Sequence, residues 1–428
     1  MKTLWRCGLI GCLLLLFAMQ EFMLAQDRTH APAAKSGVVE TDSLPDNLRQ
    51  LLLVTTSPLF QDPNAPRFVM VDRSGQYLFG IGGYVSANMF YDFNRMRELG
   101  FTVNDIPMDD SPYLRSQYLG MDMSQSRLFF RLLGDLSIGR VNAYLETDFS
   151  GASGALLLKH AYISIRHLTL GKTYSYFSDQ VAPATIDPEG PVSSTVRMVP
   201  LLGYRYVFGG HYLLAASLEF TSSTMATYYQ PESGQVVTEM VSQRFPDLPL
   251  SFSYTGHNWH VFFAWNNRVV THPTWDDFRM RYAYAVQLNA RYQFSTSERS
   301  RHRFYAQGVY ADGMGDCILD LDGEGMNLWV RPDFSRVNII PAYGVMAGYE
   351  FSYGKHTASF LYSRTQVLGN YDFADALYRS GEYASATYVC DVIENAVVGI
   401  EGIWGRRTLM DGRRGNDVRI NLLLRYDF

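Results

Sequence analysis

The sequence predicts an all-β fold, a transmembrane antiparallel β-barrel of about 16 strands with short periplasmic turns and long extracellular loops. Three observations predict it: apolar and polar residues alternate from about residue 77 onward, short and long connections follow one another in turn, and aromatic residues are frequent. The chain holds 29 Tyr and 26 Phe among 428 residues, at a mean hydropathy of −0.11. This composition is typical of strands that are apolar on one face only.

Composition excludes other classes of protein. An apolar content of 47% is too high for a disordered chain, and four cysteines are too few for a disulfide-built scaffold. A net charge of −5 without a basic block argues against nucleic-acid binding. Past the N-terminus, no apolar run reaches the roughly 18 residues that a membrane helix needs.

The N-terminus predicts export. Residues 1–25 have the pattern of a signal peptide, since Lys2 and Arg6 precede an apolar stretch and Ala25 offers a small residue at the cleavage point. A lipoprotein signal ending at Cys12 is a weaker reading, because most of the apolar stretch follows that residue. Residues 26–76 predict a periplasmic segment with one short helix over 45–53, and residues 77–428 predict the barrel.

The strand pattern is clearest at the C-terminus. Val418, Ile420 and Leu422 share one face, and Arg419 and Asn421 share the other. A soluble sheet would also alternate, but here the pattern recurs along the chain. The predicted strands are 77–93, 124–134, 139–149, 156–166, 168–177, 196–208, 211–221, 248–255, 258–269, 279–294, 302–312, 339–353, 355–366, 383–393, 396–406 and 416–428, of which 156–166 and 355–366 have ambiguous faces.

The connections predict closure and orientation. Even-numbered strands are followed by short turns such as Gly209-Gly210, whereas most odd-numbered strands are followed by long loops. Lipid offers no hydrogen-bond partner, so a sheet in the membrane must close on itself, with both termini in the periplasm. Outward aromatic residues near strand ends, such as Trp259, Trp265 and Tyr282, predict two interfacial girdles.

Several segments resemble the family of DcaP-like porins, including porins of Bacteroidota. They are Gly82-Gly83-Tyr84-Val85, Tyr91-Asp92-Phe93-Asn94, Gln125-Ser126-Arg127-Leu128, Glu146-Thr147-Asp148-Phe149, Leu158-Lys159-His160-Ala161-Tyr162, Leu170-Gly171-Lys172-Thr173-Tyr174-Ser175 and Ala311-Asp312-Gly313-Met314-Gly315. The resemblance implies a 16-stranded trimeric porin that passes small, often anionic, solutes. The family's heptad-patterned N-terminal segment is missing here, so a trimer would form through the barrel walls. The terminal Phe428 resembles the signal read by the outer-membrane barrel assembly machinery.

A barrel of this size is wide enough for an aqueous channel rather than a packed interior. Inward basic candidates are Arg127, Arg131, Arg140, Arg197, Arg205, Arg268, Arg281, Arg291, Arg419 and Arg425, and inward acidic candidates are Glu146, Asp148, Glu219, Glu350, Glu401 and Asp417. The last strand closes on the first, so Arg419 and Arg425 are expected near Arg127, Arg131 and Arg140, as a cationic stripe that attracts anions. Alternatively, these arginines pair with lumen carboxylates and only stiffen the wall.

Loop 178–195 is the candidate constriction. Pro183, Pro188 and Pro191 restrict its backbone. Folded inward, it would turn Asp179, Asp187 and Glu189 toward the arginine stripe and set up a transverse field. The alternative is an exposed loop with solvated acids.

A weak calcium-loop pattern occurs in the predicted outer loop 313–338. Asp320, Asp322 and Glu324 alternate ahead of a glycine, but Arg331 stands where a calcium loop has its last glutamate. The prediction is therefore no metal and no cofactor. Cys317 and Cys390 are expected too far apart for a disulfide.

The favoured function is an outer-membrane porin of a Gram-negative bacterium, contacting the lipid bilayer and lipopolysaccharide, passing small polar solutes and forming a homotrimer, with mild anion preference. A lipase-like barrel enzyme would need a lipid-side Ser–His pair, which the sequence does not suggest. An active transporter would need a plug domain, for which too few residues precede the first strand. A surface adhesin that uses the long loops is the remaining alternative.

Overall fold

The structure is a computed structural model that describes residues 37–40, 66, 68–72, 76–94, 100–110, 117–221, 224–230, 235–241, 243–271, 280–330, 337–369 and 377–428. The predicted signal peptide and the predicted helix over 45–53 lie outside the described residues. Within those residues, no helix is both long enough and apolar enough to cross a bilayer.

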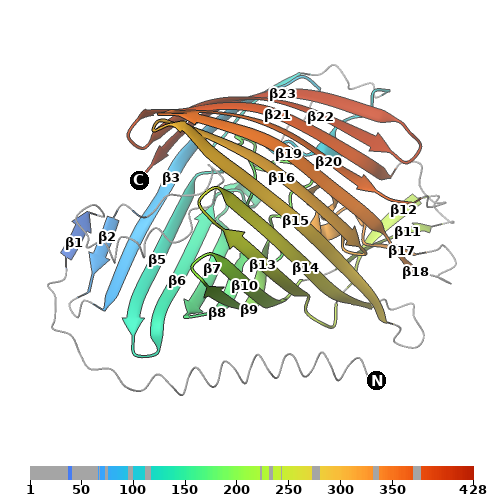
Figure 1. Ribbon diagram of the computed structural model, residues 1–428. Helices are drawn as coiled ribbons and strands as arrows, with labels where there is room; N and C mark the ends of the chain where they lie inside the picture. Colours follow the sequence, from blue (N-terminus) through green and yellow to red (C-terminus); the bar gives the residue numbers. More distant parts are fainter. Residues whose placement is uncertain are drawn as a thin grey trace.

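A closed wall of 16 antiparallel strands forms the described molecule (Figure 1). Each strand pairs with its neighbours in sequence, and the last pairs with the first. Every predicted strand corresponds to one wall strand, so the predicted fold class is confirmed. The wall strands are β3 (Tyr77–Asp92), β5 (Arg127–Leu136), β6 (Gly139–Asp148), β7 (Leu157–Ile165), β8 (Leu168–Tyr174), β9 (Met198–Phe208), β10 (Tyr212–Glu219), β13 (Leu248–Thr255), β14 (Trp259–Thr271), β15 (Met280–Ser297), β16 (Ser300–Asp312), β19 (Pro341–Tyr353), β20 (His356–Val367), β21 (Tyr378–Ile393), β22 (Ala396–Leu409) and β23 (Arg414–Asp427).

The barrel closes where β23 meets β3. Their register runs from Arg419 opposite Asp92 to Asp427 opposite Tyr84. Beyond the strand end, the backbones of Gly83 and Phe428 exchange two hydrogen bonds of 3.0 Å. The final residue of the chain therefore completes the seam, and no strand edge is left open along this length.

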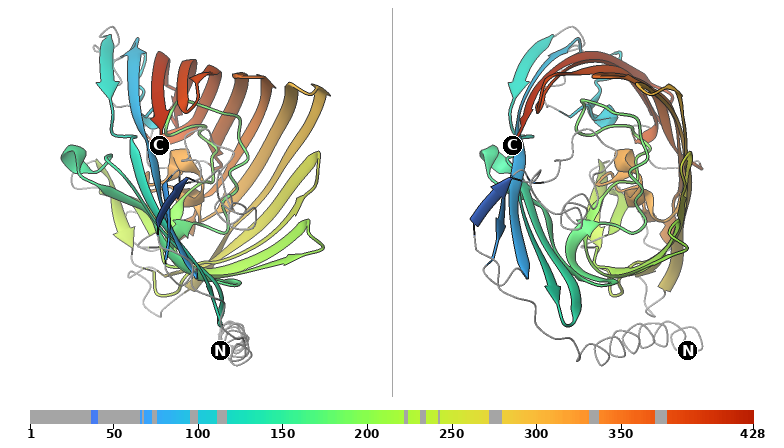
Figure 2. Two further views of the ribbon diagram at one scale, coloured as in Figure 1. Left: turned by 90° about the vertical axis from the view of Figure 1, so that its left-hand side faces the viewer. Right: turned by 60° about the vertical axis from the view of Figure 1, so that its left-hand side comes forward.

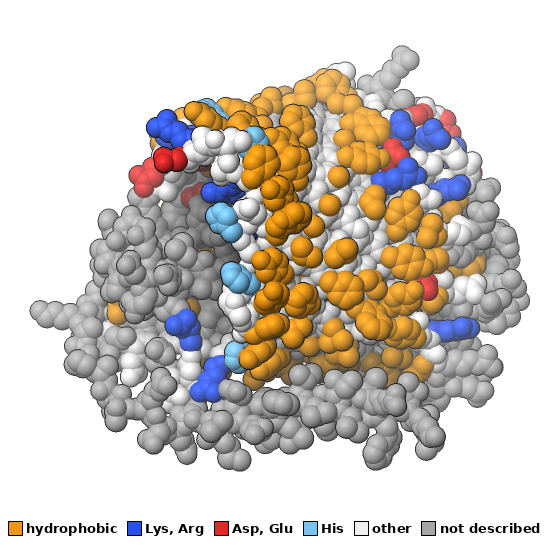
Figure 3. Space-filling model, viewed as in Figure 1, with side chains coloured by type: hydrophobic (Ala, Val, Ile, Leu, Met, Phe, Trp, Pro, Cys, Tyr) orange, Lys and Arg blue, Asp and Glu red, His pale blue; other side chains and the backbone are white. Residues whose placement is uncertain are grey.

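The two faces of the wall carry opposite kinds of side chain. Along β23, Ile420 and Leu424 are 40% and 57% exposed, whereas the intervening Arg419 and Arg425 are 0% and 3% exposed. Figure 3 shows apolar side chains spread over the outer face of the strands on the side viewed. An outer surface of this kind is stable against hydrocarbon and unfavourable in water, so the barrel spans a membrane.

Aromatic rings lie near both ends of the wall, as predicted. Near the short turns, the rings of Trp259 and Tyr292 have centroids 4.6 Å apart, and near the long loops those of Tyr282 and Tyr284 are 5.8 Å apart. Trp259 and Tyr282 are both about half exposed on the outer face. Tyrosine and tryptophan favour the polar boundary of the bilayer, which fixes the height of the barrel in the membrane.

Additional strands decorate the wall. In the N-terminal segment, β1 (Gly37–Glu40) pairs with β2 (Phe68–Val71), which pairs with β3 below the end of β23. A segment built around one short helix is therefore an incomplete prediction. Strand β4 (Tyr118–Asp122) extends the pairing of β3 at the long-loop end. A separate sheet joins β11 (Thr224–Gln230), β12 (Gln235–Val241), β17 (Leu328–Val330) and β18 (Val337–Ile339).

Two connecting segments fold into the interior of the barrel (Figure 2). Residues 175–197 connect β8 to β9. Residues 313–327 follow β16 and contain the short 3-10 helices η4 (Gly315–Cys317) and η5 (Leu319–Leu321). Met314, Ile318 and Leu321 are almost fully buried and pack against inward residues of β14, β15 and β16. The expectation of an interior without packing is therefore wrong on this side of the barrel.

Further short 3-10 helices are η2 (Val103–Asp105) and η3 (Ala152–Gly154). Val103 of η2 lies in a second buried cluster with Met346 and Tyr383 of the inner wall. Residues 100–106, which follow β3 in the chain, therefore also line the interior, at the long-loop end of the barrel.

Candidate solute channel

Arginines of the closure seam are paired with carboxylates. Arg127 of β5 donates to Glu146 of β6 at 2.9 Å, and Arg425 of β23 donates to Asp427 at 2.6 Å. Both guanidinium groups lie over the ring of Tyr84, at 5.9 and 4.0 Å from its centre. The predicted neighbourhood of these arginines is real, but their charge is largely compensated locally.

Arg419 is fully buried near the long-loop end of the seam. It donates to Asp92 at 3.0 Å, and its guanidinium lies 4.7 Å from the ring centre of Phe90 and 5.3 Å from that of Phe101. The predicted cationic stripe is therefore wrong for Arg419, because two aromatic rings and a carboxylate cover its charge. The neighbouring Asp417 is also buried.

Loop 175–197 is attached to the inner wall by two glutamates. Glu401 of β22 accepts the backbone N–H groups of Ile186 and Asp187, at 3.1 and 2.8 Å. Glu350 of β19 accepts that of Ala184 at 3.1 Å. Both carboxylates are almost fully buried, so each satisfies donors of a segment that would otherwise have no partner in the interior.

Hydroxyl groups and a glycine complete this attachment. Ser359 donates to the carbonyl of Ala184 at 2.6 Å, and Thr365 donates to that of Val192 at 3.0 Å. A Cβ at Gly348 would lie 2.3 Å from Cγ of Pro183. The loop therefore lies directly on the wall, in a space that only glycine leaves open at this position.

The three acids predicted for this loop have different surroundings. Asp187 is 1% exposed and accepts the N–H of Phe101 at 3.0 Å and the hydroxyl of Tyr383 at 3.1 Å. Burial, together with the carboxylate of Glu401, raises the pKa of Asp187 to about 8. Glu189 is exposed, and only Asp179 borders the cavity described below. The predicted transverse field from all three acids is therefore wrong, because their carboxylates do not face one common space.

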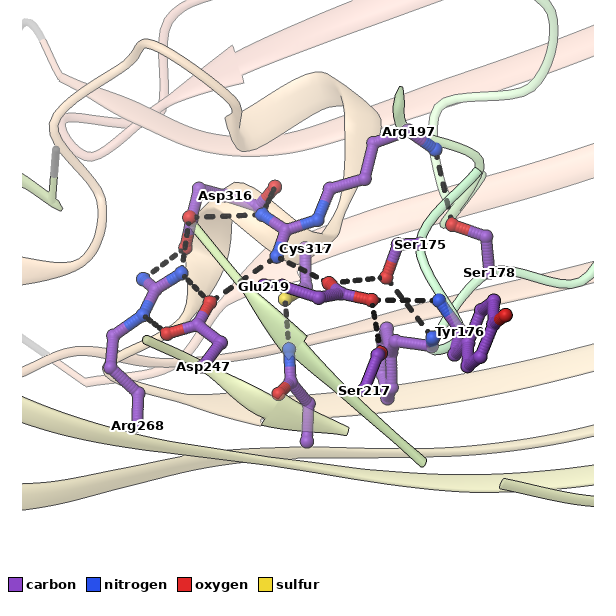
Figure 4. Close-up of polar contacts among 12 residues, drawn as sticks. Ser175, Tyr176, Ser178, Arg197, Ser217, Glu219, Asp247, Arg268, Asp316 and Cys317 are labelled. Atoms are coloured by element: carbon purple, nitrogen blue, oxygen red, sulfur yellow. Dashed lines mark hydrogen bonds and ion pairs between the residues drawn. The ribbon is translucent and has the colours of Figure 1, made fainter. Parts of the chain in front are cut away.

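A buried ion-pair network ties the second segment to the wall (Figure 4). Arg268 of β14 donates to Asp247 at 2.6 and 2.8 Å and to Asp316 at 2.8 Å through each of two nitrogens. Arg197 lies 3.2 Å from Asp316, 3.4 Å from Asp247 and 3.9 Å from Glu219. The sequence predicts that Arg197 and Glu219 line the pore, but in the structure both belong to this network.

The network contains two guanidinium groups and three carboxylates. Burial alone would raise the pKa of Asp316, but Arg268 and Arg197 hold it below its usual value. The carboxylate of Glu219 also accepts the hydroxyl of Ser175 and the N–H of Tyr176, both at 2.8 Å. One cluster thus fixes the starts of both interior segments.

The calcium-loop candidates do not converge. Asp320 is buried and accepts the hydroxyl of Tyr378, whereas Asp322 is exposed and Glu324 is half-buried. Among the described residues, no three His, Cys, Asp or Glu side chains form a group suited to a metal ion. The candidates also lie on the segment that enters the barrel, not on an outer loop as predicted. Cys317 and Cys390 are both free thiols.

The remaining predicted residues spread over the lumen wall. Asp148 is fully buried and lies 2.9 Å from Lys159. Arg140 is exposed beside a short turn, Arg281 is exposed near the long-loop end, and Arg291 is half-buried. These three arginines do not lie with the seam residues.

A polar cavity of about 460 Å³ lies between residues 175–180 and the inner wall. Strands β5 to β10, β13 and β14 contribute to it. Arg131 lies over the ring of Tyr144 and Arg205 over the ring of Tyr176, each at 5.1 Å. Its basic lining residues are Arg131, Arg166, Arg205, His160, His167 and His260, and its carboxylates are those of Glu146 and Asp179.

The sequence does not predict several residues of the ion-pair network and of the cavity. Asp247 and Asp316 stand next to predicted strand ends, where a loop acid is ordinarily solvated, and only their contact with Arg268 reveals a role. Tyr144 and Tyr176 are two of many tyrosines. A stronger signal was Gly348 in the middle of a predicted strand, since such a glycine indicates close backbone approach.

The fold and the lumen define the class of the protein as an outer-membrane barrel of the porin type. The family model of the DcaP outer membrane protein matches residues 65–428, and the chain belongs to that family. The predicted location in the Gram-negative outer membrane is thereby confirmed. No curated protein matches the chain.

Solved structures of similar fold include two outer-membrane channels. The outer membrane channel DcaP of Acinetobacter baumannii is 17% identical, with 82% of this chain and 98% of that chain covered and a TM-score of 0.70. The anion-selective porin from Comamonas acidovorans is 11% identical, with 82% and 100% covered and a TM-score of 0.51. At these identities the likeness concerns the arrangement of strands.

Proposed function

We propose that this porin passes small hydrophilic solutes by diffusion along the polar cavity, with a mild preference for anions. The cavity lining carries the proposal, because three arginines face two carboxylates, and one of these, Glu146, already accepts a hydrogen bond from Arg127. An excess of positive charge in a narrow, low-dielectric passage raises the local concentration of anions.

We propose residues 175–197 as the constriction. Hydrogen bonds that the loop backbone donates to Glu350 and Glu401 support a position inside the ring, and Ser175, Ser178 and Asp179 border the cavity. The hydroxyl, phenol and imidazole groups of the lining can replace part of a solute's hydration shell. This supports passage of polar molecules rather than apolar ones.

The proposal is tested by the reversal potential of single channels under a salt gradient. Wild-type protein should prefer chloride over potassium, and Arg131→Ala, Arg205→Ala and Arg127→Ala should each weaken that preference. Arg205→Lys keeps the charge and should retain it. Arg299→Ala removes a charge at a short turn outside the cavity and should also leave it intact.

Unchanged selectivity in all three alanine variants would refute the role of the cavity charges. A folded protein with no conductance at all would refute the channel and favour an adhesin. The family and the fold support a channel rather than an enzyme. Lipid hydrolysis by the purified protein would contradict this proposal.

The finer predictions on partners and processing stay proposals. They are assembly into a homotrimer through the barrel walls, recognition of Phe428 by the barrel assembly machinery, contact with lipopolysaccharide, removal of residues 1–25, a periplasmic segment over 26–76, and a grouping with porins of Bacteroidota.

A further inference from the structure

A row of polar side chains crosses the outer face of the wall at the long-loop end. Arg364 of β20 stands opposite Glu382 of β21, which stands opposite Arg406 of β22, which stands opposite Asn416 of β23. All four occupy outward positions, two residues above apolar ones on the same face. Figure 3 shows basic and acidic side chains interrupting the apolar surface in this part of the wall.

The row is a connected network with an excess of positive charge. Glu382 lies 3.0 Å from Arg364 and 3.6 Å from Arg406. Arg406 also donates to Asn416 at 2.9 Å and lies over the ring of Trp404 at 5.0 Å. One carboxylate is thus shared by two guanidinium groups, each about a third exposed, and the Nη2 group of Arg406 makes no hydrogen bond within the described part of the chain.

An apolar groove of about 770 Å³ begins directly below this row. Its floor consists of the small residues Ala384, Ala386 and Gly402, and its sides are raised by large ones such as Tyr362 and Trp404. A Cβ at Gly402 would have no atom within 4 Å. The wall is therefore hollowed here rather than packed.

Charge on the lipid face is costly at the middle of the bilayer and tolerated near its boundary. Arg364 and Arg406 each stand three residues before the outer end of their strands, β20 and β22, which places them about 10 Å from that end along the strand. The row thus lies at the height of lipid headgroups, and the groove extends from it toward the hydrocarbon.

We propose that the groove and the row together form a binding site for one phosphorylated lipid of the outer leaflet. An acyl chain fills the groove over Gly402, and a headgroup phosphate accepts hydrogen bonds from Arg364 and Arg406. Guanidinium groups suit this role because their planar donors bind phosphate in pairs. The lipid with phosphates in that leaflet is lipopolysaccharide, through its lipid A part.

The test is native mass spectrometry and lipid titration of the full-length protein in detergent, with diphosphorylated lipid A as the probe. The double variant Arg364→Gln/Arg406→Gln should weaken lipid A binding by about thirtyfold, which corresponds to about 1 kcal/mol for each arginine. Gly402→Leu fills the groove without changing charge and should also reduce binding severalfold. Arg299→Gln/Lys355→Gln removes the same charge at the short turns and should bind as wild type.

The double variant Arg364→Gln/Arg406→Gln and Gly402→Leu should both keep wild-type single-channel conductance, since all three residues lie on the outer face. Equal binding of lipid A by the double variant and by wild type would overturn the proposal. So would wild-type preference for phosphatidylethanolamine over lipid A, because the row would then not select phosphates. A change of oligomeric state in the variants without a change in lipid binding would identify a second copy of the chain as the occupant, and would also overturn it.

Discussion

Replacement of Glu401 by alanine tests whether loop 175–197 is held in place by the wall. Glu401 accepts the N–H groups of Ile186 and Asp187, and it also accepts Thr387 Oγ1 at 2.7 Å and Asn421 Nδ2 at 3.1 Å. A hydrogen bond to a charged group contributes about 1.5–3 kcal/mol, so the two bonds to the loop contribute about 3–6 kcal/mol. Their loss shifts the ratio of attached to detached loop at least about a hundredfold.

The assay is single-channel recording in concentrated KCl. Glu401→Ala should raise the mean conductance and the noise of the open channel, because the loop loses both backbone hydrogen bonds to β22 at its middle. Its contacts at Ala184, at the Asp187 carboxylate and at its two ends remain. Glu401→Gln keeps one acceptor oxygen and should give an intermediate value. Glu394→Ala removes a carboxylate at an exposed short turn and serves as the control for charge. Wild-type conductance and noise in a folded Glu401→Ala barrel, as judged by heat-modified electrophoretic mobility, would refute this account of the loop.

Asp187, Arg268 and Phe428 give three further predictions. The pKa of Asp187 is raised to about 8, so the attached loop holds a proton that a detached loop releases near pH 4; attachment is strongest in acid and weakens as the pH rises through about 8. Conductance should therefore increase between pH 6 and pH 9, and a persistent increase in Asp187→Asn would contradict this. Arg268→Ala leaves Asp247 and Asp316 buried without their main partner and should lower stability by about 3–5 kcal/mol, measured as an earlier loss of the compact gel band on heating. Deletion of Phe428 removes two hydrogen bonds to Gly83 and should reduce the amount of folded barrel in outer membranes, whereas Phe428→Tyr should assemble normally.

The sequence predicts the wall well because its physical constraint is strict. A strand between lipid and lumen must alternate at every residue, and closure forbids exceptions along the ring. The two strands with ambiguous faces show where the constraint relaxes. In β7 a register shift beside Lys159 interrupts the period, and in β20 Arg364 faces outward while Leu361 faces inward.

The lumen is less predictable, because alternation says which side chains face inward but not what they meet there. Arg127 and Arg197 both face the interior, yet one lies at the seam and the other in a network with residues from four separate segments. Such contacts depend on loops whose path is set by tertiary hydrogen bonds to Glu350 and Glu401. No local pattern encodes them.

The interior segment at 313–327 makes the barrel eccentric. With Met314 and Ile318 packed against β14 to β16, the polar cavity lies to one side of the interior, along β5 to β10, β13 and the first residues of β14. A solute that passes through this cavity therefore contacts the side chains of one arc of the wall, instead of moving along a symmetric central axis. Exchange of a few residues along that arc should therefore change which solutes pass, without disturbing the packed segment at 313–327.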